Sequence, residues 1–145
     1  MNYLLDTNVV SELIRRDPEP RVVDWFTSTP ESSLYLCALT LGEIQNGIAG
    51  LPAGNRRTEL TVWFSDLREA FRMQILPIDQ AVALRWGHVN AEAKSRGRRL
   101  SVIDGLIAAC ALVNEVVLVT RNIPDFEATG AELLNPWLSP ADKEL

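Results

Sequence analysis

The chain has 145 residues, of which 47% are hydrophobic and 23% are charged, and its formal net charge is −5. This composition predicts one globular domain over residues 1–145, and no apolar run approaches the roughly 18 residues that span a bilayer. The negative charge weighs weakly against nucleic-acid binding, because contacts to phosphate come from Lys and Arg.

The first predicted strand covers the bulky apolar residues at positions 3–5. Asp6, Thr7 and Asn8 follow it with an acid, a hydroxyl and an amide, and apolar residues then resume at helical spacing. We expect a helix over about 7–16 that ends before Asp17 and the proline after it. Any one of the three polar residues suits the helix N-cap, but a single cap does not require all three.

The rest of the chain alternates between extended and helical patterns. Strands are expected over 34–39, 75–78 and 116–120, with an edge strand at 132–134. Helices are expected after Pro20 and over about 40–49, 56–71, 80–97 and 102–113, with Thr40, Asp79 and Ser101 near their N-caps. Such alternation predicts an α/β fold in which a parallel sheet is covered on both faces. Active sites of these sheets lie at the carboxyl ends of the strands, which directs attention to Asp6 and to the segment after Thr120.

Asp104 lies in the segment SVIDGLIAACALV, in which every residue from 102 to 113 is apolar except Asp104 and Gly105. A helix that is apolar on all sides is expected to be buried. An ionised carboxylate near its start then needs compensation. The free N–H groups at the helix end can supply that compensation, and so can a metal ion.

Glu43 lies in the segment ALTLGEIQNGIAGL. The apolar residues of this segment form one helical stripe, and Glu43 lies about 120° from the centre of that stripe. The face around Glu43 carries Thr40, Gly47 and Gly50, and such small residues let another element approach closely. Glu43 therefore either projects into a crevice beside a neighbouring element or is an ordinary solvated glutamate.

The segment VVLVTRNIPDFE places Asn122 and Asp125 after a short apolar strand, although its Asn-Ile-Pro-Asp residues are also typical of an ordinary turn. The segment adds to a set of acids at strand ends or in early helix turns, formed by Asp6, Glu43, Asp104 and Asp125. Such acids can share one site only if cations neutralise their repulsion. Hard ions with oxygen ligands, such as Mg²⁺ or Mn²⁺, suit that role.

Four stretches together resemble the PIN-domain family, specifically the VapC/FitB-like toxins of bacterial type II toxin–antitoxin pairs. They are YLLDTNVVSEL, LTLGEIQNGI, SVIDGLIAACAL and LVTRNIPDF, which occur in family order and span nearly the whole chain. The resemblance implies a three-layer α/β/α sandwich with a central, mostly parallel sheet. It also implies a Mg²⁺- or Mn²⁺-dependent endonuclease that cleaves single-stranded RNA by in-line attack of water, leaving a 5′-phosphate and a 3′-hydroxyl.

The matching motifs give Asp6, Glu43 and Asp104 the three main acidic positions of the family. The resemblance implies that Asp6 and Asp104 hold the ion and that Glu43 positions a second ion or the attacking water. Thr7 and Thr120 would orient these ligands through hydrogen bonds.

The position that often carries a fourth acid in the family falls on Asn122 in this chain. Asn122 can still offer a carbonyl oxygen to a water molecule. Asp125, three residues later, could supply the missing charge. The departure leaves the occupancy of a second metal site open.

Lys94, Arg96, Arg98 and Arg99 form a basic run just before Asp104. Arg96, Arg98 and Arg99 could grip the phosphates that flank the cleaved bond. The same run would also suit an ordinary helix C-terminus, which cations stabilise.

The resemblance further implies a homodimer that assembles with a small DNA-binding antitoxin. Trp25 and Phe26 are candidate antitoxin contacts, or else core residues. His88, the only histidine, has no partner at metal-ligand spacing and is expected to be a bystander. Cys37 and Cys110 form no CxxC and are expected to be buried, reduced thiols of a cytoplasmic protein.

Two other functions fit part of the sequence. A phosphatase of the haloacid-dehalogenase type also has an Asp after its first strand, but it needs a second Asp where this chain has Asn8. A catalytically silent PIN-like binding module would explain the departure at Asn122. The retained Asp6, Glu43 and Asp104 count against that module.

Overall fold

The computed structural model describes residues 1–138, in which five strands form one sheet. The strands are β1 (Tyr3–Leu5), β2 (Leu34–Cys37), β3 (Ile75–Leu76), β4 (Val117–Val119) and β5 (Leu133–Leu134). Their order is β3-β2-β1-β4-β5, and every neighbouring pair is parallel. β1 therefore lies at the centre of the sheet, and all carboxyl ends of the strands share one edge.

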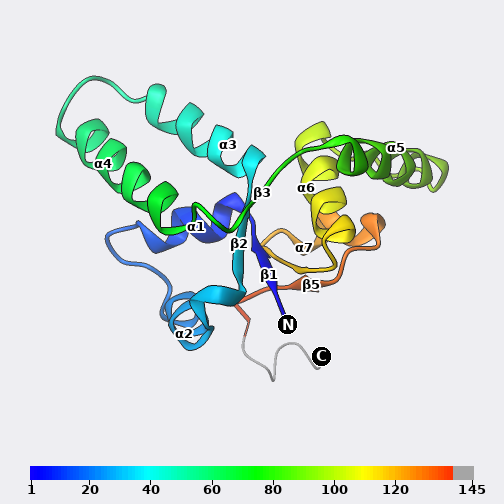
Figure 1. Cartoon of the computed structure of the whole chain (residues 1–145), viewed down its shortest axis with the longest axis horizontal. Helices are drawn as coiled ribbons and strands as arrows, with labels where there is room; N and C mark the ends of the chain where they lie inside the picture. Colours follow the sequence, from blue (N-terminus) through cyan, green and yellow to red (C-terminus); the bar gives the residue numbers. More distant parts are fainter. Residues whose placement is uncertain (139–145) are drawn as a thin grey trace.

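Seven α-helices connect these strands in the described residues. They are α1 (Thr7–Leu13), α2 (Pro20–Ser28), α3 (Ala38–Ala49), α4 (Asn55–Ala70), α5 (Gln80–Ser95), α6 (Val102–Val113) and α7 (Ile123–Phe126). Figure 1 shows α1 to α4 on one side of the sheet and α5 to α7 on the other. The predicted three-layer α/β/α sandwich is confirmed, and the sheet is parallel throughout.

The core follows from the alternation of side chains along the central strand. Leu4 packs into one cluster with α6 and α7, and Leu5 packs into the other with α1 to α4. Both side chains are almost completely buried. Cys37 and Cys110 lie in the Leu4 cluster as buried free thiols, as expected.

Several boundaries differ from the predicted ones. α1 ends at Leu13, three residues earlier than expected. Ile14 is its C-cap residue, and the backbone N–H of Ile14 donates to the carbonyl of Ser11. α3 begins at Ala38, where Cys37 is the N-cap in extended conformation. Thr40 is therefore not a cap: it is fully buried in the first turn, and its hydroxyl has no hydrogen-bond partner among residues 1–138.

The start of α6 is also different from the prediction. Val102 is 60% exposed and Ile103 is 41% exposed, so the helix is buried only from Gly105 onward. Apolar composition alone could not show that the first turn of α6 projects beyond the edge of the sheet. Within residues 1–138, none of the helices has the length and apolarity that a membrane crossing requires.

Candidate active site

Asp6 directly follows the central strand and caps α1. Its side chain is buried, yet both carboxylate oxygens accept hydrogen bonds. Oδ1 accepts from the backbone N–H of Thr7 at 2.8 Å. Oδ2 accepts from the hydroxyl of Thr120 at 2.8 Å and from the side-chain amide of Asn8 at 3.3 Å. The three polar residues after β1 thus all belong to one network, which explains why more than one was present.

Glu43 projects from α3 toward the start of α1. Its Oε1 accepts a hydrogen bond of 2.6 Å from the hydroxyl of Thr7, whose backbone N–H binds Asp6. Of the two interpretations of Glu43, the crevice is the observed one. The nearby glycine does not serve close approach, however, because a Cβ on Gly47 would meet nothing within 4 Å. Gly47 instead lines an open groove of about 170 Å³ between α1, α3 and α4.

Asp104 lies in the first turn of α6 and is half-buried, not fully buried as its apolar segment suggested. The N-cap is Ser101, whose hydroxyl accepts a hydrogen bond of 3.1 Å from the backbone N–H of Asp104. The carboxylate of Asp104 is therefore not needed as the cap. Burial raises its pKa, the hydrogen bond with Ser101 lowers it, and the charge of Asp125 raises it.

The surroundings of Asp6 raise its pKa from 3.8 to about 6. Burial is the largest cause of the rise, and the hydrogen bonds from Thr120 and Thr7 oppose it. The charges of Asp104 and Glu43 add to it. Side chains from β1, α3 and α6 therefore act on one another at the carboxyl edge of the sheet, as carboxylates do when they share a site.

The segment after β4 forms a short helix, not the ordinary turn that its sequence favoured. Asn122 is the N-cap residue of α7, and Asp125 lies in its first turn. The backbone N–H of Asn122 donates to the hydroxyl of Thr120 at 3.0 Å, which ties α7 to the network of Asp6. Both Asn122 and Asp125 are exposed.

The donor atoms of this edge suit a hard divalent cation. They are carboxylate, hydroxyl and amide oxygens, without histidine or cysteine. Oδ1 of Asp6 accepts one protein hydrogen bond and keeps a lone pair for another partner, whereas Oδ2 already accepts two. Within residues 1–138, no three His, Cys, Asp or Glu side chains lie close enough together to hold a metal ion as they stand.

The basic run begins with Lys94 in the last turn of α5 and continues into the loop before α6. Arg96 forms an ion pair of 2.7 Å with Glu92 on its own helix, as a helix C-terminus would. Arg98 donates a hydrogen bond of 3.0 Å to the backbone carbonyl of Pro124 and so reaches the start of α7. Arg99 is exposed and makes no ion pair within residues 1–138.

Sequence reasoning missed two residues of this site. Asn8 bridges the site by donating to Asp6 and to Thr120 and by accepting from the backbone N–H of Arg121 at 3.3 Å. Its place among three polar residues was a signal for it. Arg121 had no such signal, because one arginine after a strand is unremarkable.

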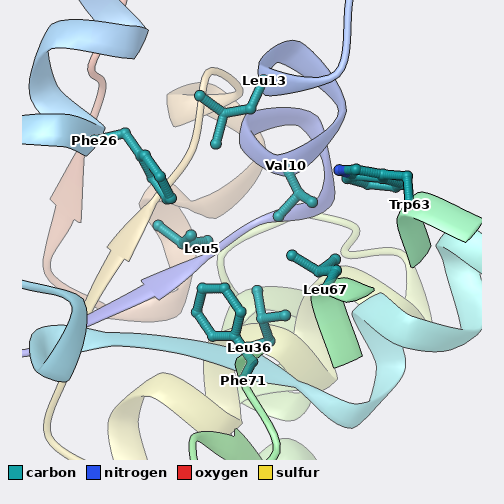
Figure 2. Close-up of a pocket in the computed structure, with 8 residues that line it drawn as sticks. All are labelled: Leu5, Val10, Leu13, Phe26, Leu36, Trp63, Leu67 and Phe71. Atoms are coloured by element: carbon teal, nitrogen blue, oxygen red, sulfur yellow. The ribbon is translucent and has the colours of Figure 1, made fainter. Parts of the chain in front are cut away.

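An apolar pocket of about 160 Å³ lies on the α1 to α4 side of the sheet (Figure 2). Phe26 lines it from α2, facing residues of β1, β2, α1 and α4. Trp25 is partly buried and packs edge-on against Tyr3, at 5.2 Å between ring centroids. His88 is exposed on α5 beside a shallow depression.

The family model of the PIN domain matches residues 3–131. The chain belongs to the PIN domain family. This PIN domain is 36% identical to the VapC ribonuclease Y4jK of Sinorhizobium fredii, over 92% of this chain and 96% of that protein. It is also 36% identical to toxin FitB of Neisseria gonorrhoeae, over 92% of this chain and 97% of FitB. A chain from the structure of FitAB bound to the IR36 DNA fragment matches it with a TM-score of 0.91 at 35% identity, covering 94% of this chain and 96% of that one. The family resemblance of the four sequence stretches is confirmed.

Proposed function

We propose that this PIN domain is the toxin of a type II toxin–antitoxin pair and that it hydrolyses single-stranded RNA with Mg²⁺ or Mn²⁺. The observation that carries the proposal is the buried carboxylate of Asp6 at the end of the central strand, with two further acids acting on it. The relatives at 36% identity, which match nearly the whole chain, are named a ribonuclease and a toxin.

The residues of the site have distinct parts in this proposal. Asp6 and Asp104 would hold the cation, and Glu43 would complete the set. A divalent ion bound there stabilises charge on phosphate oxygens and lowers the pKa of water. Thr120 and Thr7 hold the carboxylates of Asp6 and Glu43 in place through hydrogen bonds of 2.8 and 2.6 Å.

The amide of Asn122 remains available to a water or substrate hydroxyl, because its side chain makes no capping hydrogen bond. Asp125 adds negative charge beside Asp104. We assign Asp125 the supporting part that a fourth acid would have, acting on Asp104.

Cleavage of a labelled single-stranded RNA by the purified chain tests this function. We expect cleavage with Mn²⁺ or Mg²⁺ and none in EDTA, and a loss of at least about 100-fold in Asp6→Asn and Asp104→Asn. Asp66→Asn, an exposed position on α4, is the matched control and should cleave normally. Metal-independent cleavage, or normal cleavage by Asp104→Asn, would contradict the proposal. A folded wild-type chain that cleaves no RNA with either ion would favour the silent binding module.

A toxin of this kind requires an antitoxin, and we propose that the pocket in Figure 2 receives an apolar side chain from it. The pocket is lined only by apolar and aromatic residues, which is the setting of interface hot spots. Trp63→Ala should weaken binding of the antitoxin encoded beside this chain by about tenfold or more. Val62→Ala, at an exposed neighbouring position on α4, should bind normally. Equal binding by both variants would rule out this pocket. The homodimer stays a prediction.

A further inference from the structure

A second pocket, of about 230 Å³, opens at the carboxyl edge of the sheet. Arg121 and Trp137 line it from the segments that follow β4 and β5. Arg15 and the loop of residues 17–20 line it from the α1 side. The pocket therefore adjoins the acidic site through Arg121, whose backbone N–H is bonded to Asn8.

Arg121 is the notable side chain of this pocket. Its guanidinium carbon lies 5.2 Å from the centroid of the Trp137 ring, and the side chain is exposed. A cation–π contact orients a guanidinium without using its N–H donors. Within residues 1–138 the guanidinium donates no hydrogen bond, so all five donors are available to a ligand.

The other charges of the pocket are largely engaged with one another. Arg15 binds both carboxylate oxygens of the buried Glu12, at 3.0 and 2.9 Å. The same carboxylate accepts from the backbone N–H of Glu19 at 2.9 Å, and the carboxylate of Glu19 is paired with Arg21. The exposed Asp17 carries the remaining negative charge. Within residues 1–138 Arg121 makes no direct ion pair, although its charge acts on Glu12 and lowers the pKa of that carboxylate.

A short chain of hydrogen bonds connects Arg121 to the acidic site. Its backbone N–H donates to Asn8 at 3.3 Å, and Asn8 donates to Asp6 at 3.3 Å. Arg98 reaches the same segment after β4, where it donates to the backbone carbonyl of Pro124 at 3.0 Å. Two cationic side chains therefore belong to or contact the segment that is hydrogen-bonded to the acidic site, although the chain as a whole has a net charge of −5.

We infer that Arg121, seated on Trp137, binds a phosphate of the RNA strand next to the one that is cleaved. This inference rests on the proposed ribonuclease function. A strand of phosphates approaching several carboxylates is repelled unless cations hold it on either side. The planar fork of a guanidinium binds a phosphate through two N–H groups, and its position on the ring fixes the direction of that fork.

Binding of a fluorescein-labelled, mixed-sequence 20-nucleotide RNA, followed by anisotropy in EDTA at several KCl concentrations, tests the inference. Arg121→Gln should raise Kd about 5- to 10-fold and reduce the slope of log Kd against log salt by about 0.7, the value for one phosphate of a single strand. Trp137→Leu should also raise Kd, because the guanidinium of Arg121 loses the aromatic ring that orients it. Arg68→Gln is the matched control, since Arg68 also lies over an aromatic ring, 4.8 Å from the centroid of Phe64, but on α4.

The outcomes separate this inference from the function on which it rests. If the wild-type chain cleaves RNA with Mn²⁺ but Arg121→Gln binds RNA like Arg68→Gln, the inference is wrong and the function stands. If Arg121→Gln weakens binding as expected but the wild type cleaves nothing, the phosphate contact stands and the proposed function is wrong. A wild-type chain that binds no RNA overturns the inference.

Discussion

Asp6 is placed where function and stability oppose each other. Its burial disfavours the charged form, and the hydrogen bonds from Thr120 and Thr7 only partly compensate. The neighbouring acids make the charge still less favourable. An ionised carboxylate in such surroundings costs stability unless a cation compensates for its charge.

Asp6→Asn is expected to stabilise the metal-free chain at pH 8. The folded-state pKa of about 6 lies above the ordinary value of 3.8, so ionised Asp6 costs stability at high pH, and that cost disappears as the pH falls below both values. Urea unfolding in EDTA should show the variant about 1–3 kcal/mol more stable at pH 8, with the difference closing by pH 4. A variant less stable than wild type at pH 8 would mean that the carboxylate has a purely structural role.

Glu12 is also buried, but its pKa is shifted in the direction opposite to that of Asp6. Burial raises its pKa, but the hydrogen bonds from the backbone N–H of Glu19 and from Arg15 outweigh burial, and the net pKa is lowered. A lowered folded-state pKa contributes stability that is present above the unfolded pKa and is lost as the pH falls through the folded one. Glu12 therefore fixes the loop after α1, which carries Arg15 and the wall of the Arg121 pocket.

Glu12→Gln should lower the free energy of unfolding by about 1–3 kcal/mol at pH 7. The loss should shrink as the pH falls through the wild-type pKa, which lies below the ordinary value of 4.5. Glu59→Gln serves as the control, because Glu59 is exposed and lies 3.9 Å from Arg56, and it should change stability by under 1 kcal/mol. A pH-independent loss in Glu12→Gln would show that packing, not charge, is responsible.

At the scale of elements, the contact between α5 and α6 sets the position of Asp104. Gly105 follows Asp104, and a Cβ there would lie 2.9 Å from the Trp86 indole. The indole N–H of Trp86 has no hydrogen-bond partner among residues 1–138, so its position depends on packing. Close packing at Gly105 therefore holds the first turn of α6 against α5.

Gly105→Ala should destabilise the chain by about 1–3 kcal/mol, since Trp86 or the helix must shift. RNA cleavage should fall as well, because Asp104 moves with the helix. Gly87→Ala is the control, because Gly87 lies inside α5 and a Cβ there would meet nothing within 4 Å. Alanine at this position should stabilise the folded chain by about 0.5–1 kcal/mol. Thermal unfolding of both variants decides the matter, and equal stability of the two would contradict the packing role of Trp86.

The elements themselves could largely be predicted from sequence. Period and capping signals placed all five strands and the helices from α1 to α6, with Asp79 and Ser101 as observed N-caps. Thr40 was predicted as an N-cap because a hydroxyl near a helix start often has that role. The N-cap of α3 is instead Cys37, in extended conformation. The helix over residues 123–126 was predicted as a turn because a short helix with proline in its first turn has the same composition as a turn.

At the scale of the whole molecule, the strand order creates the site. β1 lies between β2 and β4, so the segments after these strands meet at one edge. The rule that active sites lie at the carboxyl ends of parallel strands predicted that Asp6 and the segment after Thr120 lie near one another. The resemblance of the motifs to the family added Glu43 and Asp104 to the predicted site. No sequence rule pairs Arg121 with Trp137, because their contact depends on β4 and β5 being neighbours and on the path of each loop.

In the proposed mechanism, Asp6 and Asp104 belong to one cation site. Calorimetric titration of the purified, EDTA-treated chain with Mn²⁺ tests it most directly, with Asp6→Asn and Asp104→Asn beside the Asp66→Asn control. We predict saturable binding by the wild type and the control, and a loss of at least about tenfold in affinity in each site variant. Equal Mn²⁺ binding by all four proteins, or none by the folded wild type, would contradict the account.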